Sequence, residues 1–175
     1  RAALRDTVQD MAGAQAAPPK WVCGDSTHTL ATAPAADMLF TCPPYGNLEV
    51  YSDDPADISG MDTDQFLAAY AAIIAQAAAK LRNNRFAAFV VSTYRDQRSG
   101  KDPQRLVDLP GETTRACAAA GLRYYNEIML VNSVGTAAMR AELNFIRGAG
   151  KVVNCHQSIL VYIKGDERAA ADHIR

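Results

Sequence analysis

The chain has 175 residues, of which 49% are hydrophobic and 21% charged, and its formal net charge is −1. This composition is typical of a globular domain with its own core. The balanced charge excludes nucleic-acid binding through a basic field over the whole protein, so any polyanion site must be a local patch.

Cysteine usage and the apolar runs bear on the compartment. Four cysteines lie far apart without a Cys-x-x-Cys pair, which indicates reduced thiols and a cytoplasmic protein. No apolar run reaches the ~18 residues of a membrane span, and no signal peptide is visible, so we expect no membrane partner. The chain begins with Arg1, as a processed product or a fragment would.

Helical and strand patterns alternate along the chain. Apolar residues at helical spacing predict helices over 1–14, 62–82 and 110–120, with a shorter one over 137–145. Short apolar runs predict strands over 21–23, 37–41, 85–92, 124–131 and 157–164. Asp62 and Gln65 predict a capping box on the second helix. The strand over 37–41 is apolar at successive positions, as in a sheet buried on both faces.

This order predicts an α/β fold with a largely parallel sheet. No long helix separates the last two strands, so we expect them to form an antiparallel pair at the sheet edge. No repeat or linker divides the chain, so residues 1–175 are expected to form a single domain.

Two prolines directly follow the strand predicted over 37–41, in the segment Cys42-Pro43-Pro44-Tyr45. Proline cannot continue a strand ladder because it has no N–H to donate. In open α/β sheets, ligands bind at the carboxyl ends of the strands. The carbonyls of Cys42 and Pro43 could accept hydrogen bonds from an exocyclic amine, and Tyr45 could stack on a base that has left its duplex. A rigid turn with a half-buried tyrosine is the alternative.

Three segments resemble the amino-group methyltransferases. Thr41 to Gly46 resembles their catalytic motif, Asp/Asn/Ser-Pro-Pro-Tyr/Phe/Trp, and Gly24-Asp25-Ser26 with Ala36 to Phe40 resembles the segments before that motif. Cys155 to Gly165 is similar to the family's "H-E-x-I-L-V-F-x-K-G" segment. The resemblance covers most of residues 20–166. It is closest to phage-type DNA methylases with a Ser-Cys-Pro-Pro-Tyr variant followed by Leu-Glu-Val-Tyr-Ser.

The resemblance implies a Rossmann-like sheet and methyl transfer from S-adenosylmethionine to N6 of adenine or N4 of cytosine in DNA. Catalysis would rest mostly on positioning the amine, and no metal is implied. The implied catalytic residues are Cys42, Pro43, Pro44 and Tyr45. The implied cofactor-binding residues are Asp25, Ser26, Thr41 and Cys42, with Asp25 contacting the adenine amine of the cofactor.

Two features depart from the family pattern. Cys42 replaces Asp, Asn or Ser, and a thiol is a weak hydrogen-bond acceptor, so a cysteine nucleophile for carbon-5 methylation is an alternative. The family's Gly-rich segment is absent from the sequence. With the family strand order 3-2-1-4-5-7-6, the strand over 21–23 would be strand 3, and strands 1 and 2 would be missing. We therefore expect this chain to be the C-terminal part of a longer enzyme. The alternatives are a partner chain that supplies the Gly-rich half and a degenerate protein.

Charged loops complete the predicted site. The loop over 47–64 carries six acids and no base, and Glu49, Tyr51 and Asp53 are candidates for the rim of a base pocket. A solvated capping loop is the alternative. Six basic residues are predicted to contact the DNA backbone: Arg95, Arg98, Lys101, Arg140, Arg147 and Lys151. Ordinary surface charge is the alternative.

Two other functions stay open at this point. An RNA amino-methyltransferase is one, because Pro-Pro-Tyr-Gly also ends the motif of tRNA guanine-N2 enzymes. A non-catalytic subunit that binds nucleic acid or stabilises a partner methyltransferase is the other, favoured by the absent Gly-rich segment.

Overall fold

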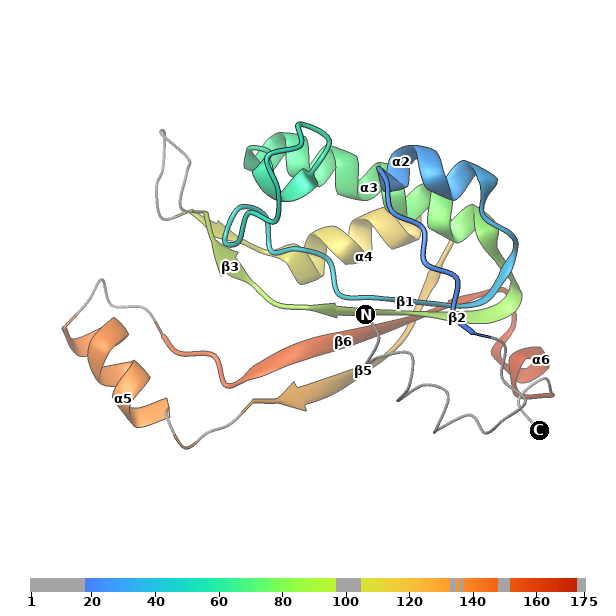
Figure 1. Cartoon of the computed structure of the whole chain (residues 1–175). Coiled ribbons are helices and arrows are strands. Elements are labelled where there is room, and N and C mark those ends of the chain that lie inside the picture. The colour runs from blue at the N-terminus through green and yellow to red at the C-terminus, as the bar shows by residue number, and fades with distance from the viewer. Residues whose placement is uncertain (1–17, 97–104, 133–134, 136, 148–151, 173–175) are drawn as a thin grey trace.

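A computed structural model describes residues 18–96, 105–132, 135, 137–147 and 152–172 of the chain (Figure 1). Its main sheet has four strands in the order β1-β2-β6-β5. These are β1 (Ala36–Thr41), β2 (Leu81–Val91), β5 (Arg123–Val131) and β6 (His156–Lys164). A small second sheet pairs β3 (Tyr94–Arg95) with β4 (Leu106–Val107).

Strand direction in the main sheet agrees with the predicted fold class. β1 and β2 are parallel, and β6 runs antiparallel to both of its neighbours, β2 and β5. β1, β2 and β5 therefore share one direction, and β6, which lies between β2 and β5, runs in the opposite direction. This mixed α/β arrangement confirms a mostly parallel sheet with an antiparallel last strand. The predicted antiparallel pairing of the last two strands is also confirmed, with β5 at the edge.

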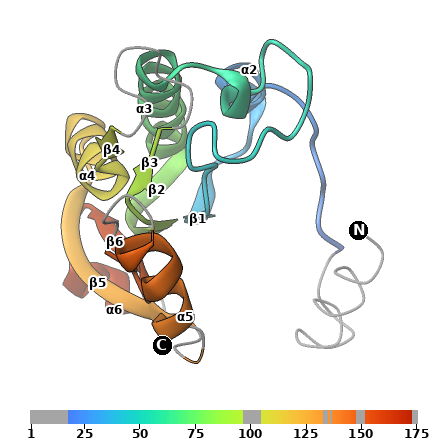
Figure 2. The ribbon, with the colours of Figure 1, turned by 90° about the vertical axis from the view of Figure 1, so that its left-hand side faces the viewer.

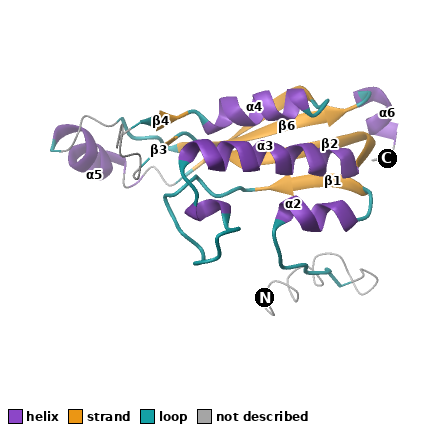
Figure 3. Cartoon of the chain, turned by 90° about the horizontal axis from the view of Figure 1, so that it is seen from above, coloured by secondary structure: helices purple, strands orange, loops and turns teal. Residues whose placement is uncertain are grey.

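The helices divide between one face of the sheet and its two ends. The bounds are α2 (Ser26–Thr29), α3 (Thr63–Lys80), α4 (Leu109–Ala119), α5 (Ala137–Ala141) and α6 (Glu167–Asp172), with a π-helical turn over Glu142–Ile146 after α5. Helices α2, α3 and α4 lie side by side over one face, as the view from above shows (Figure 3). The end-on view in Figure 2 shows the same single layer of these helices. Helix α5 stands away from the sheet at one end (Figure 1).

The core lies between this helical layer and the sheet. Phe66, Tyr70 and Ile74 form the buried stripe of α3, as their spacing predicts. They face alternate residues of the central strands, where Phe89 and Tyr162 meet edge to face with ring centroids 5.8 Å apart. The capping box is present: Asp62 accepts from the Gln65 N–H, and Gln65 accepts from the Asp62 N–H.

Two predicted strands need correction. Residues 21–23 form no strand, and Trp21 is exposed. A strand needs a neighbour to satisfy its backbone groups, and the described residues offer none beyond β1. Strand β1 has the predicted position but only one buried face: Leu39 packs on the core, whereas Met38 and Phe40 are 58% and 63% exposed on the opposite face. The short helix over 26–29 was not predicted, and the helix predicted over 1–14 lies outside the described residues.

The buried thiol of Cys117 predicts a pH dependence of stability. Cys117 on α4 is fully buried, and burial raises the pKa of its thiol to about 12. The unfolded thiol titrates near 8.5, so above that pH the unfolded state binds fewer protons and the free energy of unfolding falls. We expect a decline of at most about 1.4 kcal/mol per pH unit from this group between pH 9 and 11. Urea unfolding across that range, with Cys117→Ala as the variant that loses this part of the slope, measures it.

Candidate functional site

The Cys-Pro-Pro-Tyr turn lies at the carboxyl end of β1, as predicted. β1 ends at Thr41, and the turn leaves Cys42 exposed and Pro43 buried. Tyr45 is half-buried, and its hydroxyl accepts a 2.8 Å hydrogen bond from the Gln157 side-chain amide at the start of β6. Because β6 is antiparallel, its start meets the carboxyl ends of β1 and β2 at one edge of the sheet. The phenol is thereby held in one orientation from across the sheet.

The residues after the turn anchor it to the smaller sheet. Gly46 has φ +54°, and a Cβ at this position would collide with the side chain of the buried Tyr94. Asn47 donates a 2.9 Å hydrogen bond to the buried Asp96 carboxylate, which also accepts from the Thr63 hydroxyl at the start of α3. Buried polar groups of this kind hold a loop firmly because breaking one bond leaves its partner without solvation.

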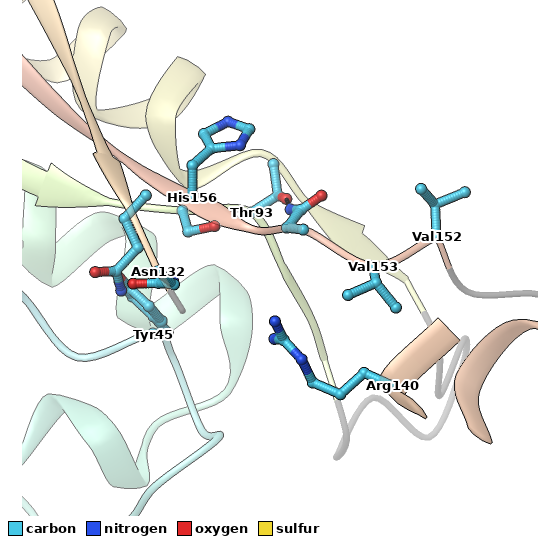
Figure 4. Close-up of a pocket in the computed structure, with 10 residues that line it drawn as sticks. Tyr45, Thr93, Asn132, Arg140, Val152, Val153 and His156 are labelled. Carbon is cyan, nitrogen blue, oxygen red and sulfur yellow. Dashed lines mark hydrogen bonds between the residues drawn. The ribbon is translucent and has the colours of Figure 1, made fainter. Parts of the chain in front are cut away.

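A cavity of about 320 Å³ lies on the Tyr45 side of the turn (Figure 4). It is at the low end of the volumes of small-molecule sites. Tyr45 forms one wall, and the Arg140 side chain extends from α5 toward the space between them (Figure 4). The remaining lining consists of Ser92, Thr93, Asn132, Val152, Val153, Asn154, His156 and Gln157.

A second cavity, also of about 320 Å³, lies on the other side of the turn, between β1 and α3. Thr41, Cys42, Pro43 and Ser26 contribute to its wall, so three of the predicted cofactor-binding residues share one cavity. Most of the lining is apolar, and no charged residue of the described chain belongs to it. Asp25, the fourth predicted residue, lines a neighbouring hollow that shares Ser26 with this cavity.

The Asp25 carboxylate is engaged locally. It caps α2, accepting from the Thr27 N–H at 2.8 Å and the Thr27 hydroxyl at 2.7 Å, and it pairs with His28 Nδ1 at 2.9 Å. The Thr27 hydrogen bonds hold the pKa of Asp25 below its usual range. The Gly-Asp-Ser segment therefore has a capping role in the described fold, with the carboxylate ionised at neutral pH.

The predicted rim residues divide. The Tyr51 hydroxyl donates to Glu49 at 3.3 Å, and both side chains are exposed beside the turn. Tyr51 lies close enough to Cys42 and Tyr45 to contribute to the raised pKa of the Tyr45 phenol. Asp53 is exposed and lines neither of the two cavities.

Burial, followed by the neighbouring Cys42, raises the pKa of Tyr45 to about 12. The phenol is therefore neutral throughout the physiological range, and its ring presents an uncharged face to the cavity. A neutral aromatic face suits stacking on a base of any sequence.

The predicted phosphate contacts are placed unevenly. Arg140 lines the Tyr45 cavity, whereas Arg147 is exposed and pairs with Glu142 at 2.6 Å. Arg95 lies on β3, outside the lining of that cavity. Arg98, Lys101 and Lys151 lie outside the described residues.

The three carboxamide residues of this cavity, Asn132, Asn154 and Gln157, were among the lining residues that the sequence analysis did not single out for any role. Asn132 directly follows β5, and Gln157 is the second residue of β6. β5 runs in the same direction as β1 and β6 runs in the opposite direction, so the end of β5 and the start of β6 lie at the same end of the sheet as the end of β1. Assigning strand directions from the expected antiparallel pair would have found both. No group of three His, Cys, Asp or Glu in the described part of the chain could hold a metal ion.

Comparison with solved structures shows which folds share this arrangement. TTHA0409 of Thermus thermophilus, named as a DNA modification methylase, matches with TM-score 0.55 and 18% identity over 82% of this chain and 54% of its own, in a complex with S-adenosyl-L-methionine. The cytosine-N4-specific PvuII DNA methyltransferase matches with TM-score 0.56 and 14% identity over 82% of this chain and 48% of its own. The chain has the fold of these proteins and spans about half of their length. No protein-family model and no curated protein matches it.

The partial coverage agrees with a sheet that lacks the first strands of the methyltransferase order. Among the described residues strand 3 is missing as well as strands 1 and 2, because residues 21–23, expected to form it, are not a strand. The four strands present follow the order 4-5-7-6, with the antiparallel strand in place 7. No helix in the described residues is long and apolar enough to cross a membrane.

Proposed function

We propose that this chain is the catalytic part of an S-adenosylmethionine-dependent DNA methyltransferase that modifies an exocyclic amine, N6 of adenine or N4 of cytosine. The observation that carries the proposal is the position of Tyr45. Its neutral ring is held by Gln157 at the carboxyl edge of the sheet, with one cavity on its own side of the turn and another on the Cys42 side. An enzyme that transfers a group between two substrates needs two adjacent binding sites, and the turn lies between two such cavities.

The turn would act on the amine by positioning it. The base would stack on Tyr45, and the carbonyls of Cys42 and Pro43 would accept hydrogen bonds from its exocyclic N–H groups. Both carbonyls belong to a turn that its two prolines make rigid and that lies outside the strands of the sheet. The nitrogen lone pair would form the new N–C bond as the S–CH3 bond of the sulfonium breaks, so that the neutral thioether S-adenosylhomocysteine leaves, and the nitrogen would then lose one proton to water. Glu49 and Tyr51 would form the rim, and Arg95, Arg98, Lys101, Arg147 and Lys151 would contact the DNA backbone.

The cavity beside Cys42 fits part of the cofactor. S-adenosylmethionine supplies the methyl group as a sulfonium. The apolar wall and the hydroxyls of Ser26 and Thr41 suit its adenosine portion, with Asp25 near the adenine amine. The uncharged lining that the described residues provide offers nothing to the carboxylate and ammonium of its amino-acid portion. That end needs a further segment, and the family's Gly-rich loop has this role.

The exposed side of β1 supports the proposal that a further segment completes the sheet. β1 is the edge strand of the sheet, so one side of its backbone has no ladder partner among the described residues. Met38 and Phe40, with Tyr125, Ile128 and Leu130 farther across, expose large apolar side chains on the face opposite the helices. We propose that a Gly-rich segment, from a longer protein or a partner chain, pairs with β1 and covers this face.

The test is methyl transfer by the protein purified from its native coding context, so that any further segment or partner is present. Calorimetry should give micromolar binding of S-adenosylmethionine there, and weak binding by the 175-residue chain alone. Tritiated cofactor and unmethylated genomic DNA should give labelled N6-methyladenine or N4-methylcytosine. DNA binding without any label would contradict the proposal and favour a non-catalytic subunit.

Cys42→Ser belongs to the same experiment, because it separates amine chemistry from a covalent mechanism. A serine keeps the backbone carbonyl and offers a better acceptor than a thiol, so the variant should retain activity within about tenfold of the wild type. Complete loss of activity in the variant, together with labelled 5-methylcytosine as the product of the wild type, would instead indicate a cysteine nucleophile.

A further inference from the structure

The cavity beside Tyr45 has an unusual balance of charge for a region close to an acidic loop. Among the described residues, its lining contains one cation, Arg140, and no carboxylate. Its other polar side chains include three carboxamides, those of Asn132, Asn154 and Gln157. Arg140 is a donor only, so the side of the cavity nearest to it favours an acceptor-rich ligand edge.

Arg140 faces Tyr45 across the cavity. It comes from α5, which stands beyond the end of the sheet, whereas Tyr45 comes from the turn after β1 (Figures 1 and 4). Arg147, a cation on the same segment, does not line the cavity and pairs with Glu142. A base stacked on Tyr45 with its amine at the turn would therefore present a neighbouring edge to the Arg140 guanidinium.

The three bases that carry amines differ at that neighbouring edge. Next to its amine, cytosine has two adjacent acceptors, N3 and O2. Adenine has one acceptor, N1, followed by a C–H group, and guanine has an N–H donor on one side of its N2 amine. A guanidinium fork matches two adjacent acceptors and meets an unfavourable group on adenine or guanine.

We propose that Arg140 reads N3 and O2 of a flipped cytosine, which makes N4 of cytosine the methylated amine. This inference rests on the proposed function and names its base. It assigns Arg140 to the base rather than to the phosphate backbone, the role that the sequence indicated for it.

The experiment measures fluorescence anisotropy of labelled oligo(dC) and oligo(dA) of equal length with the 175-residue chain, at mildly alkaline pH and low salt. The wild type should bind oligo(dC) about fivefold more tightly, in line with the discrimination of a bidentate Arg contact. Arg140→Gln should reduce this ratio to below about twofold. Because the backbone and stacking differences between the oligonucleotides are the same for both proteins, the change in the ratio isolates the base contact.

Two matched variants control for charge. Arg147→Gln removes a cation from the same segment. It should weaken the binding of both oligonucleotides equally and leave the ratio of the two affinities unchanged. Arg168→Gln removes one from α6, at the opposite end of the sheet from α5 (Figure 1), and should change neither affinity. Equal weakening of both oligonucleotides by Arg140→Gln would overturn the proposal, because that is the signature of a phosphate contact.

The methylated product distinguishes this inference from the proposed function. N4-methylcytosine in the labelled DNA would support both. N6-methyladenine would overturn the cytosine assignment and leave the amine methyltransferase standing. A cytosine preference that depends on Arg140, without any methyl transfer, would support the base contact and contradict the proposed function.

Discussion

Tyr45→Ala should reduce methyl transfer by about 10- to 100-fold. Stacking of one base on an aromatic side chain contributes about 1–3 kcal/mol, and tenfold in rate corresponds to about 1.4 kcal/mol. The tyrosine ring lines the cavity next to the proposed amine acceptors. Without it, the base loses the flat surface that orients its amine toward the Cys42 and Pro43 carbonyls.

Two matched variants make this result specific. Tyr45→Phe keeps the ring and removes only the hydrogen bond from Gln157, so it should retain activity within about fivefold. Tyr51→Ala removes an exposed ring at the rim and should have a smaller effect than Tyr45→Ala. Steady-state methyl transfer measures all three, and circular dichroism melting shows that each variant is folded. Full activity of Tyr45→Ala in a folded protein would rule out the stacking role.

Gly46→Ala should lower the free energy of unfolding by about 2–5 kcal/mol. A Cβ at this position would lie 2.3 Å from the Tyr94 hydroxyl and 2.6 Å from the ring carbon that bears it. Tyr94 is only 3% exposed, so its ring has little room to move. The φ of +54° adds a penalty of about 1–2 kcal/mol for a residue with a side chain, and overpacking adds about 1–3 kcal/mol.

Two other glycines separate these contributions. Gly121 has φ +79°, but a Cβ there meets nothing within 4 Å, so Gly121→Ala should cost about 1 kcal/mol through backbone strain alone. Gly60 has neither a positive φ nor a close neighbour, and Gly60→Ala should change stability by less than about 0.5 kcal/mol. Urea unfolding of the three variants should give this order. Equal stability of Gly46→Ala and Gly121→Ala would show that Tyr94 yields without cost.

The same substitution links stability to the site. Gly46 directly follows Tyr45, and the next residue, Asn47, is anchored by its hydrogen bond to Asp96. A shift at Gly46 therefore displaces the aromatic ring relative to the amine acceptors. Displacements of about 1 Å at a reacting group can cost about 100-fold in rate, so Gly46→Ala should lose activity even at a temperature where it stays folded.

The fold was largely predictable from local patterns. The α3 helix could be located because Asp62 and Gln65 mark its start and its apolar stripe repeats at helical spacing. The strands β2, β5 and β6 follow from short apolar runs between breakers, although β2 begins at Leu81, earlier than predicted. The strand predicted over 21–23 was wrong because composition records a preference for extended backbone but not the presence of a neighbour to pair with.

The site was predictable only in part. The turn at Cys42 to Tyr45 could be found because two prolines after a strand are a local signal that needs no knowledge of the rest of the chain. The partners of Tyr45 gave no such signal: Gln157 is 112 residues away and reaches it because β6 runs against β2. The exposure of Met38 and Phe40 on β1 was also not predictable, because an apolar strand has the same sequence pattern whether or not the described residues cover both of its faces.

The sequence alone determined the alternation of helices and strands, the capping of α3 and the rigid turn after β1, since each depends on side chains close together in the chain. Only the tertiary structure decided which residues meet at the sheet edge. Strand order and direction bring Tyr45, Gln157 and Arg140 to one cavity and leave β1 without a second neighbour among the described residues. These contacts join segments far apart in sequence, and their geometry is set by backbone pairing across the sheet, which no local pattern encodes.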